Sequence, residues 1–178
     1  NAGANVMLGG DGDDTLVGGL GNDVLDGGRG NDVLNGGTGV DAVSYASALG
    51  AVTVDLANTG AQNTVNAGTD TLVGIVNLTG SNFGDTLTGN DAANLMRGGV
   101  GNDVLNVYSS AGVAGTTTIV GGENAGDRDF LEIRFNDGFV SSTPITVTFT
   151  GDEAGTAVRG GNTVVFSEIE QVATGSGA

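Results

Sequence analysis

An aspartate recurs every nine residues near the start of the sequence, and each one follows a segment that is rich in glycine. Residues 9–17 read GGDGDDTLV, residues 18–26 GGLGNDVLD, residues 27–35 GGRGNDVLN and residues 36–44 GGTGVDAVS. In this frame glycine stands at positions 1, 2 and 4, aspartate at position 6, and leucine or valine at position 8. Carboxylates and backbone carbonyls are the oxygen ligands that Ca²⁺ prefers. The spacing therefore predicts ligation of a hard cation.

A second block keeps the same period further along the chain. Residues 98–106 read GGVGNDVLN and match the pattern fully, whereas residues 80–88 and 89–97 are degraded copies. Asn94 stands where aspartate belongs, and Asn5 does the same in a partial copy that precedes the first block. Because asparagine carries no charge, we expect weaker sites at both.

The predicted metal ligands are the position-6 carboxylates and the glycine carbonyls of the turns. The carboxylates are Asp14, Asp23, Asp32, Asp41, Asp85 and Asp103. The glycines are Gly9, Gly10, Gly12, Gly18, Gly19, Gly21, Gly27, Gly28, Gly30, Gly36, Gly37, Gly39, Gly98, Gly99 and Gly101. Position 5 adds Asn22, Asn31 and Asn102, which we predict to be supporting ligands or turn formers. Aspartates that only form turns are the alternative for an isolated copy, but consecutive copies in register favour ligation.

The elements that must position these residues follow from the same period. We expect a six-residue turn followed by a three-residue strand, with position 8 pointing inward and positions 7 and 9 outward. Two repeats complete one coil, so each repeat stacks on the next but one. The inward residues of the first block are Leu16, Leu25, Leu34 and Val43. The expected carboxylate pairs are Asp14 with Asp32, Asp23 with Asp41, and Asp85 with Asp103, and Asn5 is expected beside Asp23.

This pattern resembles the RTX (repeats-in-toxin) family of calcium-binding nonapeptide repeats. The residues that carry the resemblance are 9–44 and 80–106. It implies an all-β fold, a parallel β-roll or right-handed β-solenoid that binds several Ca²⁺ ions. It further implies a secreted bacterial protein, extracellular or at the cell surface, that leaves the cell unfolded through type I secretion machinery and folds where calcium is plentiful.

Composition narrows the function further. The net charge of −16 disfavours nucleic acid and anionic membrane surfaces as partners. The absence of His and Cys removes the usual catalytic bases, nucleophiles and zinc ligands, so we expect no enzyme activity in this chain. No run approaches the roughly 20 apolar residues of a membrane span. The sequence starts within a repeat, so we expect it to belong to a longer protein.

The repeats divide the chain into an expected β-roll over residues 1–106 and a different segment over 107–178. The roll comprises the blocks 1–44 and 80–106, joined by a strand-rich segment 45–79 in which Asp55 and Asp70 are either further ligands or ordinary surface residues. From 107 onward, alternating β-branched strands predict a β cap or a small β domain, without the glycine-rich turns that bind ions. A relic of the motif survives at Asp129 and Leu131.

Two functions remain open. One is a calcium-driven module that stabilises a secreted enzyme or toxin or assists its secretion. The alternative is a structural or adhesive element of an extracellular matrix, surface layer or self-assembling adhesin, with possible self-association through the ends of the solenoid.

Overall fold

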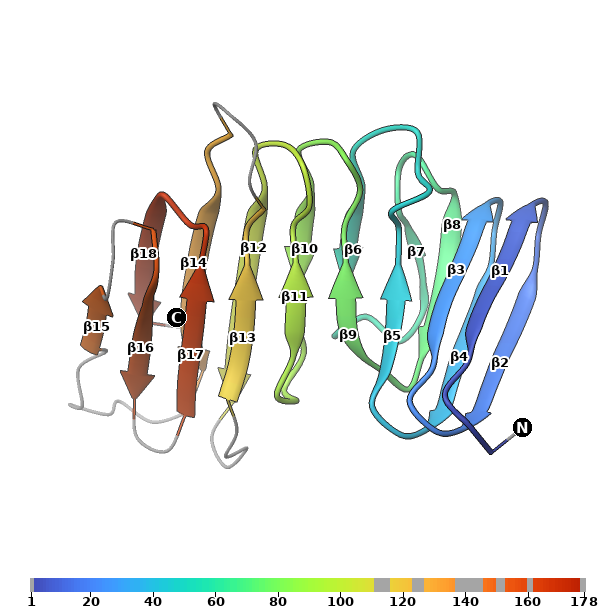
Figure 1. Cartoon of the computed structure of the whole chain (residues 1–178), viewed down its shortest axis with the longest axis horizontal. Coiled ribbons are helices and arrows are strands. Elements are labelled where there is room, and N and C mark those ends of the chain that lie inside the picture. Colours follow the sequence, from blue (N-terminus) through green and yellow to red (C-terminus); the bar gives the residue numbers. More distant parts are fainter. Residues whose placement is uncertain are drawn as a thin grey trace.

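The chain forms two layers of β-strands that wind into a flattened coil (Figure 1). The computed structural model describes residues 2–110, 116–122, 127–136, 146–149, 153–159 and 162–176, and these contain strands but no α-helix. None of the described residues forms a helix long and apolar enough to cross a membrane. The predicted all-β class with stacked parallel strands is confirmed.

The front layer in Figure 1 is a single sheet with the order β1-β3-β5-β9-β11-β13-β17-β16-β15. Its strands are β1 (Val6–Asp11), β3 (Val24–Arg29), β5 (Asp41–Ser44), β9 (Ile75–Thr79), β11 (Leu95–Arg97), β13 (Thr116–Val120), β17 (Asn162–Ser167), β16 (Gly155–Arg159) and β15 (Thr146–Phe149). From β1 to β17 the neighbours are parallel, and β16 is antiparallel to both β17 and β15.

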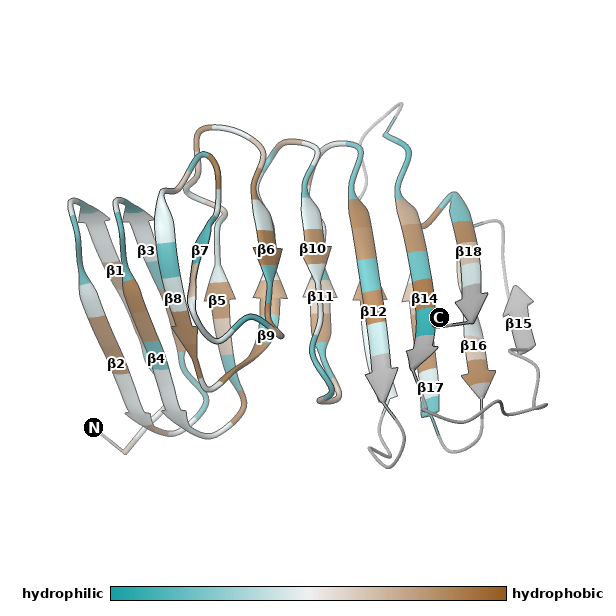
Figure 2. Cartoon of the chain, turned by 180° about the vertical axis from the view of Figure 1, so that it is seen from behind, coloured by the Kyte–Doolittle hydropathy of each residue, from teal (hydrophilic) through white to brown (hydrophobic). Residues whose placement is uncertain are grey.

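The back layer, seen from its own side in Figure 2, consists of two sheets with the orders β2-β4-β8-β7 and β18-β14-β12-β10-β6. Their strands are β2 (Thr15–Leu20), β4 (Val33–Thr38), β8 (Thr69–Val73), β7 (Ala61–Asn63), β18 (Gln171–Ser176), β14 (Phe130–Asn136), β12 (Val104–Ser110), β10 (Thr86–Thr88) and β6 (Thr53–Asp55). The only antiparallel pair of named strands in this layer, among the described residues, is β7 with β8.

The register confirms that each repeat stacks on the next but one. Met7 lies beside Leu25 in the front layer, and Leu16 lies beside Leu34 in the back layer. Leu25 and Leu34 are completely buried, whereas Met7 and Leu16 are only partly buried because they belong to the first coil. In the first block the core is therefore a single file of side chains between the two layers. The file continues with Val43, Leu72, Leu78, Leu87, Met96, Leu105, Ile119, Leu131 and Phe166, and the later strands bury a second residue beside it, namely Val107, Ile133 and Val164.

The strands of the first block are longer than the predicted three residues. β2 covers positions 7–9 of one repeat and positions 1–3 of the next, so the turn shrinks to positions 4–6. Gly19 is part of the strand and pairs with Gly37 of the next coil. Both glycines have a positive φ, +101° and +95°, which a residue with a side chain adopts at a cost. In the degraded copies β10 and β11 the strands do have three residues.

The segment 45–68 inserts two strands, β6 and β7, into the back layer between β8 and β10. Gln62 on β7 joins them across the gap between the two back sheets. Its Oε1 accepts a hydrogen bond from the Asp55 N–H at 2.8 Å, and its Nε2 donates to the Asp55 carbonyl at 3.0 Å. One buried amide side chain thus replaces a pair of backbone hydrogen bonds.

The coil runs past the boundary that we placed after residue 106, which falls inside β12. β14 and β18 extend the back layer in parallel register, and β13 and β17 extend the front layer. Along β12 and β14 brown bands alternate with teal ones in Figure 2, whereas β2 and β4 are brown over part of their length and near white elsewhere. The antiparallel part of this segment is confined, among the described residues, to β15 and β16.

Candidate metal centres at the turns

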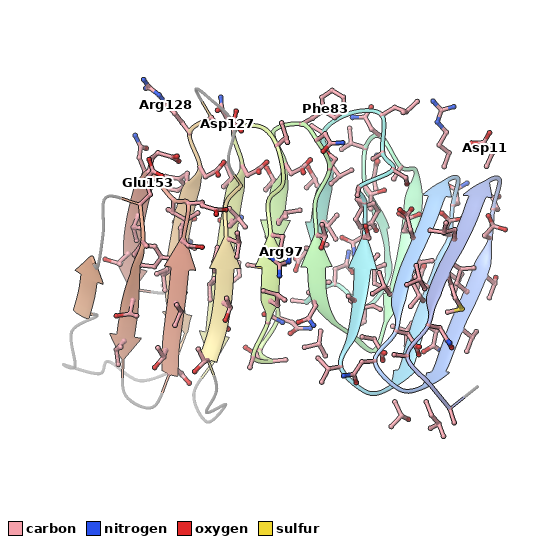
Figure 3. All side chains as sticks on the ribbon, in the orientation of Figure 1. Asp11, Phe83, Arg97, Asp127, Arg128 and Glu153 are labelled. Atoms are coloured by element: carbon pink, nitrogen blue, oxygen red, sulfur yellow. The ribbon has the colours of Figure 1, made fainter. Side chains whose placement is uncertain are left out.

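The turns of the coil lie along two edges, which we call the upper edge and the lower edge after their places in Figure 1. The upper edge joins front strands to back strands, and Figure 3 places Phe83 and Asp127 along it. One row of acidic residues along it comprises Asp14, Asp32, Asp85, Asp103, Asp129 and Glu170, each just before a back strand, and Asp70, the second residue of β8. The lower edge carries Asp23 and Asp41, just before or at the start of β3 and β5. The predicted ligands therefore fall into two rows.

Within each row, one carboxylate oxygen holds the coil before it. The Asp14 N–H donates to Asp32 Oδ1 at 2.8 Å, and the Asp23 N–H donates to Asp41 Oδ1 at the same distance. The Asp85 N–H donates to Asp103 Oδ1 at 2.7 Å. The structure thus brings together the three expected pairs, and the Asn5 N–H likewise donates to Asp23 Oδ1. These bonds satisfy turn amides that the stacking removes from water.

The second carboxylate oxygen is left without a partner. The Oδ2 atoms of several of these residues are buried and accept no hydrogen bond in the part of the chain that the structure describes, namely those of Asp14, Asp23, Asp32, Asp41 and Asp103. Asp23 and Asp32 are 1 % exposed, and Asp103 is 0 % exposed. An unpaired buried carboxylate costs several kcal/mol, so this arrangement favours neutralisation of the charge by a cation or, without one, by a proton.

Glycine at position 1 makes room for that oxygen. A Cβ atom added to Gly9 would lie 2.6 Å from Asp14 Oδ2 and 2.5 Å from the Gly27 carbonyl oxygen of the next coil. At Gly18 the corresponding distances are 2.4 Å to Asp23 Oδ2 and 2.5 Å to the Gly36 carbonyl oxygen. Each carboxylate oxygen therefore lies close to a carbonyl oxygen that belongs to the neighbouring coil.

Glycines at positions 2 and 4 bring further carbonyls between the coils. A Cβ atom on Gly28 would lie 2.0 Å from the Gly10 carbonyl oxygen, and one on Gly30 would lie 2.1 Å from the Gly12 carbonyl oxygen. Both Gly28 and Gly30 have a positive φ. Only a residue without a side chain allows the backbones to approach so closely.

The asparagines at position 5 hold the turns in register. Asn22 Oδ1 accepts the Val40 N–H at 2.9 Å, and Asn102 Oδ1 accepts the Arg128 N–H at 2.7 Å. Asn31 Oδ1 accepts the Thr69 N–H at 3.0 Å. Of the two roles that we expected for these residues, the hydrogen bonds favour the turn former.

Asp70 occupies a place in the upper row that we left open in the sequence. It is 1 % exposed, and its Oδ1 accepts the Asp32 N–H at 3.1 Å. Its Oδ2 accepts hydrogen bonds from Tyr45 Oη at 3.1 Å and Thr64 Oγ1 at 3.0 Å. The protein's own hydroxyls therefore satisfy this carboxylate. The sequence does contain a pattern that indicates this place for Asp70, because residues 68–73 read GTDTLV and keep positions 4, 6 and 8 of the motif.

Asp85 is satisfied in a similar way by Ser81, which replaces the position-2 glycine. Asp85 Oδ1 accepts Ser81 Oγ at 2.7 Å and the Val52 N–H at 2.7 Å, and its Oδ2 accepts the Ser81 N–H at 2.5 Å. Asp55, the other open candidate, is partly exposed, and its Oδ1 accepts the Ala57 N–H at 2.8 Å. It lies within β6 and not at a turn of either row.

The lower row loses its charge after Asp41. Asn94 is 2 % exposed and forms a closed set of hydrogen bonds, donating from Nδ2 to the Val76 carbonyl at 2.7 Å and accepting the Asn90 N–H at 3.1 Å. By register, Thr117 and Val164 take the same place in the following coils. The amide at Asn94 fills its own place without an ion, consistent with the weak site that we expected there.

Burial makes several of these carboxylates hard to ionise. It raises the pKa of Asp85, and it raises the pKa of Asp103 to about 8 against the hydrogen bond from the Asp85 N–H. It likewise raises the pKa of Asp32, where the charge of Asp70 adds to the effect. Burial, and to a lesser extent the charge of Asp70, also raises the pKa of the Tyr45 hydroxyl, so this hydroxyl stays protonated and donates a hydrogen bond. A divalent cation beside these carboxylates would lower their pKa values again.

The donor set suits calcium. Among the described residues there is no group of three or more His, Cys, Asp or Glu side chains placed to hold a metal. Calcium does not need such a group, because backbone carbonyls and water complete its shell of six to eight oxygens. Paired carboxylates with converging glycine carbonyls provide that mixture, whereas nitrogen and sulfur ligands are missing because the sequence has no His or Cys.

Comparison with known families agrees with this geometry. The family model described as RTX calcium-binding nonapeptide repeat (4 copies) matches residues 1–43 and 77–107. These two blocks are RTX calcium-binding nonapeptide repeats. The matched residues are the two repeat blocks, and they contain all of the predicted ligands named above.

A search among curated proteins found no match to this RTX chain. Among the solved structures that match is the extracellular lipase LipA from Serratia marcescens, with 20 % sequence identity and a TM-score of 0.34. The alignment covers 94 % of this chain and 36 % of the lipase chain, so the chain spans about a third of the length of that protein.

Proposed function

We propose that this chain is a calcium-driven folding module of a secreted bacterial protein, which stays unfolded inside the cell and folds after export. The observation that supports this most directly is the set of buried Oδ2 atoms without hydrogen-bond partners in the stacked turns, at Asp14, Asp23, Asp32, Asp41 and Asp103. These residues and the glycine carbonyls beside them would hold the ions. Calcium would supply positive charge and would take no part in redox chemistry.

The physical argument links ion binding to folding. In the first repeat block the core is one side chain wide, so hydrophobic burial alone offsets little of the entropy lost on ordering these coils. Without a cation, the stacked carboxylates either repel one another or take up protons. With a cation, binding free energy becomes folding free energy, about 2.7 kcal/mol for each independent site at a free calcium concentration of 100 Kd.

Secretion follows from the same coupling as part of the proposal. A chain that cannot fold at the low free calcium of the cytosol remains unfolded for export, and the type I machinery is the route that the family suggests. We place any catalytic activity of the full-length protein outside this segment, where this module would stabilise it or assist its secretion.

The test is a calcium titration of the chelated chain followed by circular dichroism. We expect a cooperative gain of β signal at millimolar Ca²⁺, and little change with Mg²⁺ because its smaller shell holds water and demands octahedral geometry. A matched control is the chain with Asp→Asn at positions 14, 23, 32, 41 and 103, which keeps the hydrogen-bond acceptors but removes charge. A fully folded spectrum in chelator, unchanged by calcium, would overturn the proposal.

A further inference from the structure

The upper row of carboxylates continues beyond the last matched repeat. The family model ends at residue 107, but Asp129 stands at the same edge one coil later and is 0 % exposed. Its Oδ1 accepts the Asp103 N–H at 2.8 Å, as Asp103 does for Asp85. β12 and β14 pair in parallel with Leu105 beside Leu131. The coil of β14 thus repeats the geometry of an RTX coil although the nine-residue spacing is lost.

The turn before β14 also stacks like an RTX turn. The Arg128 N–H donates to Asn102 Oδ1 at 2.7 Å, which is the bond that Asn22 forms with Val40 in the first block. The Gly101 N–H donates to Asp127 Oδ2 at 3.1 Å, and Figure 3 shows Asp127 at the upper edge. Position by position, the two turns are therefore held in register.

The oxygens around Gly98 match those around the glycines of the first block. A Cβ atom on Gly98 would lie 2.2 Å from Asp103 Oδ2 and 2.5 Å from the carbonyl oxygen of Gly121 in the next coil. The same two kinds of oxygen surround Gly9 at 2.6 and 2.5 Å. Asp103 Oδ2 is buried and accepts no hydrogen bond from the described residues. This oxygen points to a cation independently of the acidic character of the turn.

Gly121 and Gly122 stand where the repeat has its first two glycines. A Cβ atom on Gly121 would lie 2.2 Å from Asp129 Oδ2, and Gly122, with φ of +137°, approaches the Gly99 carbonyl oxygen in the same manner as Gly28 approaches that of Gly10. We expected no glycine-rich turn of this kind after residue 106, and the structure places one here. An insertion between Gly122 and Asp127 hides its nine-residue spacing.

We propose that a calcium ion binds between the turn of Asp103 and the turn of Asp129, with Asp129 as a carboxylate ligand that the repeat motif does not supply. This rests on the proposed function and extends the calcium array into the C-terminal coils. Glu170 ends the array, because its Oε2 accepts the Asp129 N–H but its side chain is exposed to solvent. The C-terminal coils are then built by calcium as well as by their apolar core.

The first test is isothermal titration of the full chain with Ca²⁺, comparing Asp129→Asn with the unaltered chain. Asparagine keeps an oxygen that can accept the Asp103 N–H and removes only the charge. Glu132→Gln is the matched control, since it removes one acidic charge from the same strand at a side chain that is paired with Arg134 on the surface. We expect Asp129→Asn to lose one ion or to bind it at least tenfold more weakly, and Glu132→Gln to bind like the unaltered chain.

Hydrogen exchange read by mass spectrometry locates the effect. In the unaltered chain calcium should protect both residues 6–38 and residues 127–136. In Asp129→Asn, the calcium concentration at which residues 127–136 become half-protected should rise at least tenfold. The corresponding concentration for residues 6–38 should not change. If residues 127–136 exchange rapidly in Asp129→Asn at every calcium concentration, a second variant, Asp129→Glu, distinguishes the explanations. Calcium-dependent protection that returns in Asp129→Glu supports the ligand role of residue 129. Continued rapid exchange in that variant contradicts it.

The two proposals fail in different ways. Equal ion numbers, affinities and midpoints in Asp129→Asn and in the unaltered chain would overturn the added site and leave calcium-driven folding intact. No protection of residues 6–38 by calcium in the unaltered chain would overturn the proposed function itself.

Discussion

At the scale of the residue, several repeat aspartates divide two tasks between their two oxygens. Oδ1 accepts an amide hydrogen of the preceding coil, and Oδ2 faces glycine and a carbonyl oxygen with no donor of its own, as Asp23 shows. The first task needs only an acceptor, whereas the second needs negative charge and a cation. Asparagine should therefore replace aspartate in stacking but not in ion binding. Asn94 contacts the preceding coil in a different way, because its Nδ2 donates to the Val76 carbonyl while its Oδ1 accepts the Asn90 N–H of its own turn.

This division predicts the effect of removing one charge. Asp32→Asn should keep the hydrogen bond from the Asp14 N–H but lower calcium affinity at its site at least tenfold, about 1.4 kcal/mol. Asp91→Asn should leave binding unchanged, because Asp91 is exposed in the turn whose place in the row is taken by the neutral Asn94. Calorimetric titration of both variants measures the difference. Equal losses would contradict the assignment of the rows.

The raised pKa of Asp103 predicts a pH dependence. Between its ordinary value of 3.8 and about 8, the folded chain without metal holds a proton that the unfolded chain releases. Its contribution to the free energy of unfolding is therefore present at acid pH and is lost as pH rises towards 8. Calcium must also displace this proton. Calorimetric titration with Ca²⁺ at pH ~7, in buffers of different ionisation enthalpy, should show that calcium binding releases protons and that Asp103→Asn releases fewer. Equal proton release in both chains would contradict the raised pKa of Asp103.

At the scale of the element, hydroxyl groups of the inserted segment 45–68 stabilise a buried carboxylate, a role that we assign to a calcium ion in the repeats. Tyr45 and Thr64 both donate to Asp70 Oδ2, and Gln62 joins the two back sheets. We therefore interpret this segment as a joint between two stretches of the upper row whose own stability does not depend on calcium.

The joint can be tested in the calcium-saturated chain. Tyr45→Phe removes one donor to a buried carboxylate, which costs about 1–3 kcal/mol, so the midpoint of thermal unfolding should fall. Thr64→Val should act in the same direction. Tyr108→Phe, the other tyrosine of the chain, is the control and should change the midpoint little. If all three variants melt like the unaltered chain, Asp70 is not held by these hydroxyls.

How far the sequence predicts these elements depends on whether the nine-residue frame is intact. It predicts the coil, the stacking of alternate repeats and the pairs Asp14–Asp32, Asp23–Asp41 and Asp85–Asp103, because position 6 alone fixes them. It does not predict the partners of Asp70, since Tyr45 precedes it by 25 residues and only the folded insertion brings the two together. It also hides the turn of Asp129, because an insertion breaks the spacing while the strand register survives.

At the scale of the whole molecule, the two edges of the roll differ. The upper edge carries acidic residues from Asp14 to Glu170. On the lower edge, the place of Asp41 is taken in the later coils by Asn94, Thr117 and Val164. Under the proposed function, calcium would hold both edges of the first coils but mainly one edge of the later ones. The later coils compensate with larger apolar side chains, of which Phe166 and Ile133 are almost completely buried.

The later coils should therefore lower the calcium requirement of the whole chain. A chain cut after residue 106 loses β13 from the edge of β11 and β14 from the edge of β12, which uncovers Met96 and Leu105, both completely buried in the intact coil. The lost packing must be replaced by ion binding, so we expect the segment 1–106 to fold at higher calcium than the whole chain, or to aggregate. Side-by-side calcium titrations followed by circular dichroism and light scattering measure both outcomes. A monomeric 1–106 that folds at the same calcium midpoint as the whole chain would show instead that the repeats are an independent domain and that the coils after them add nothing to their stability.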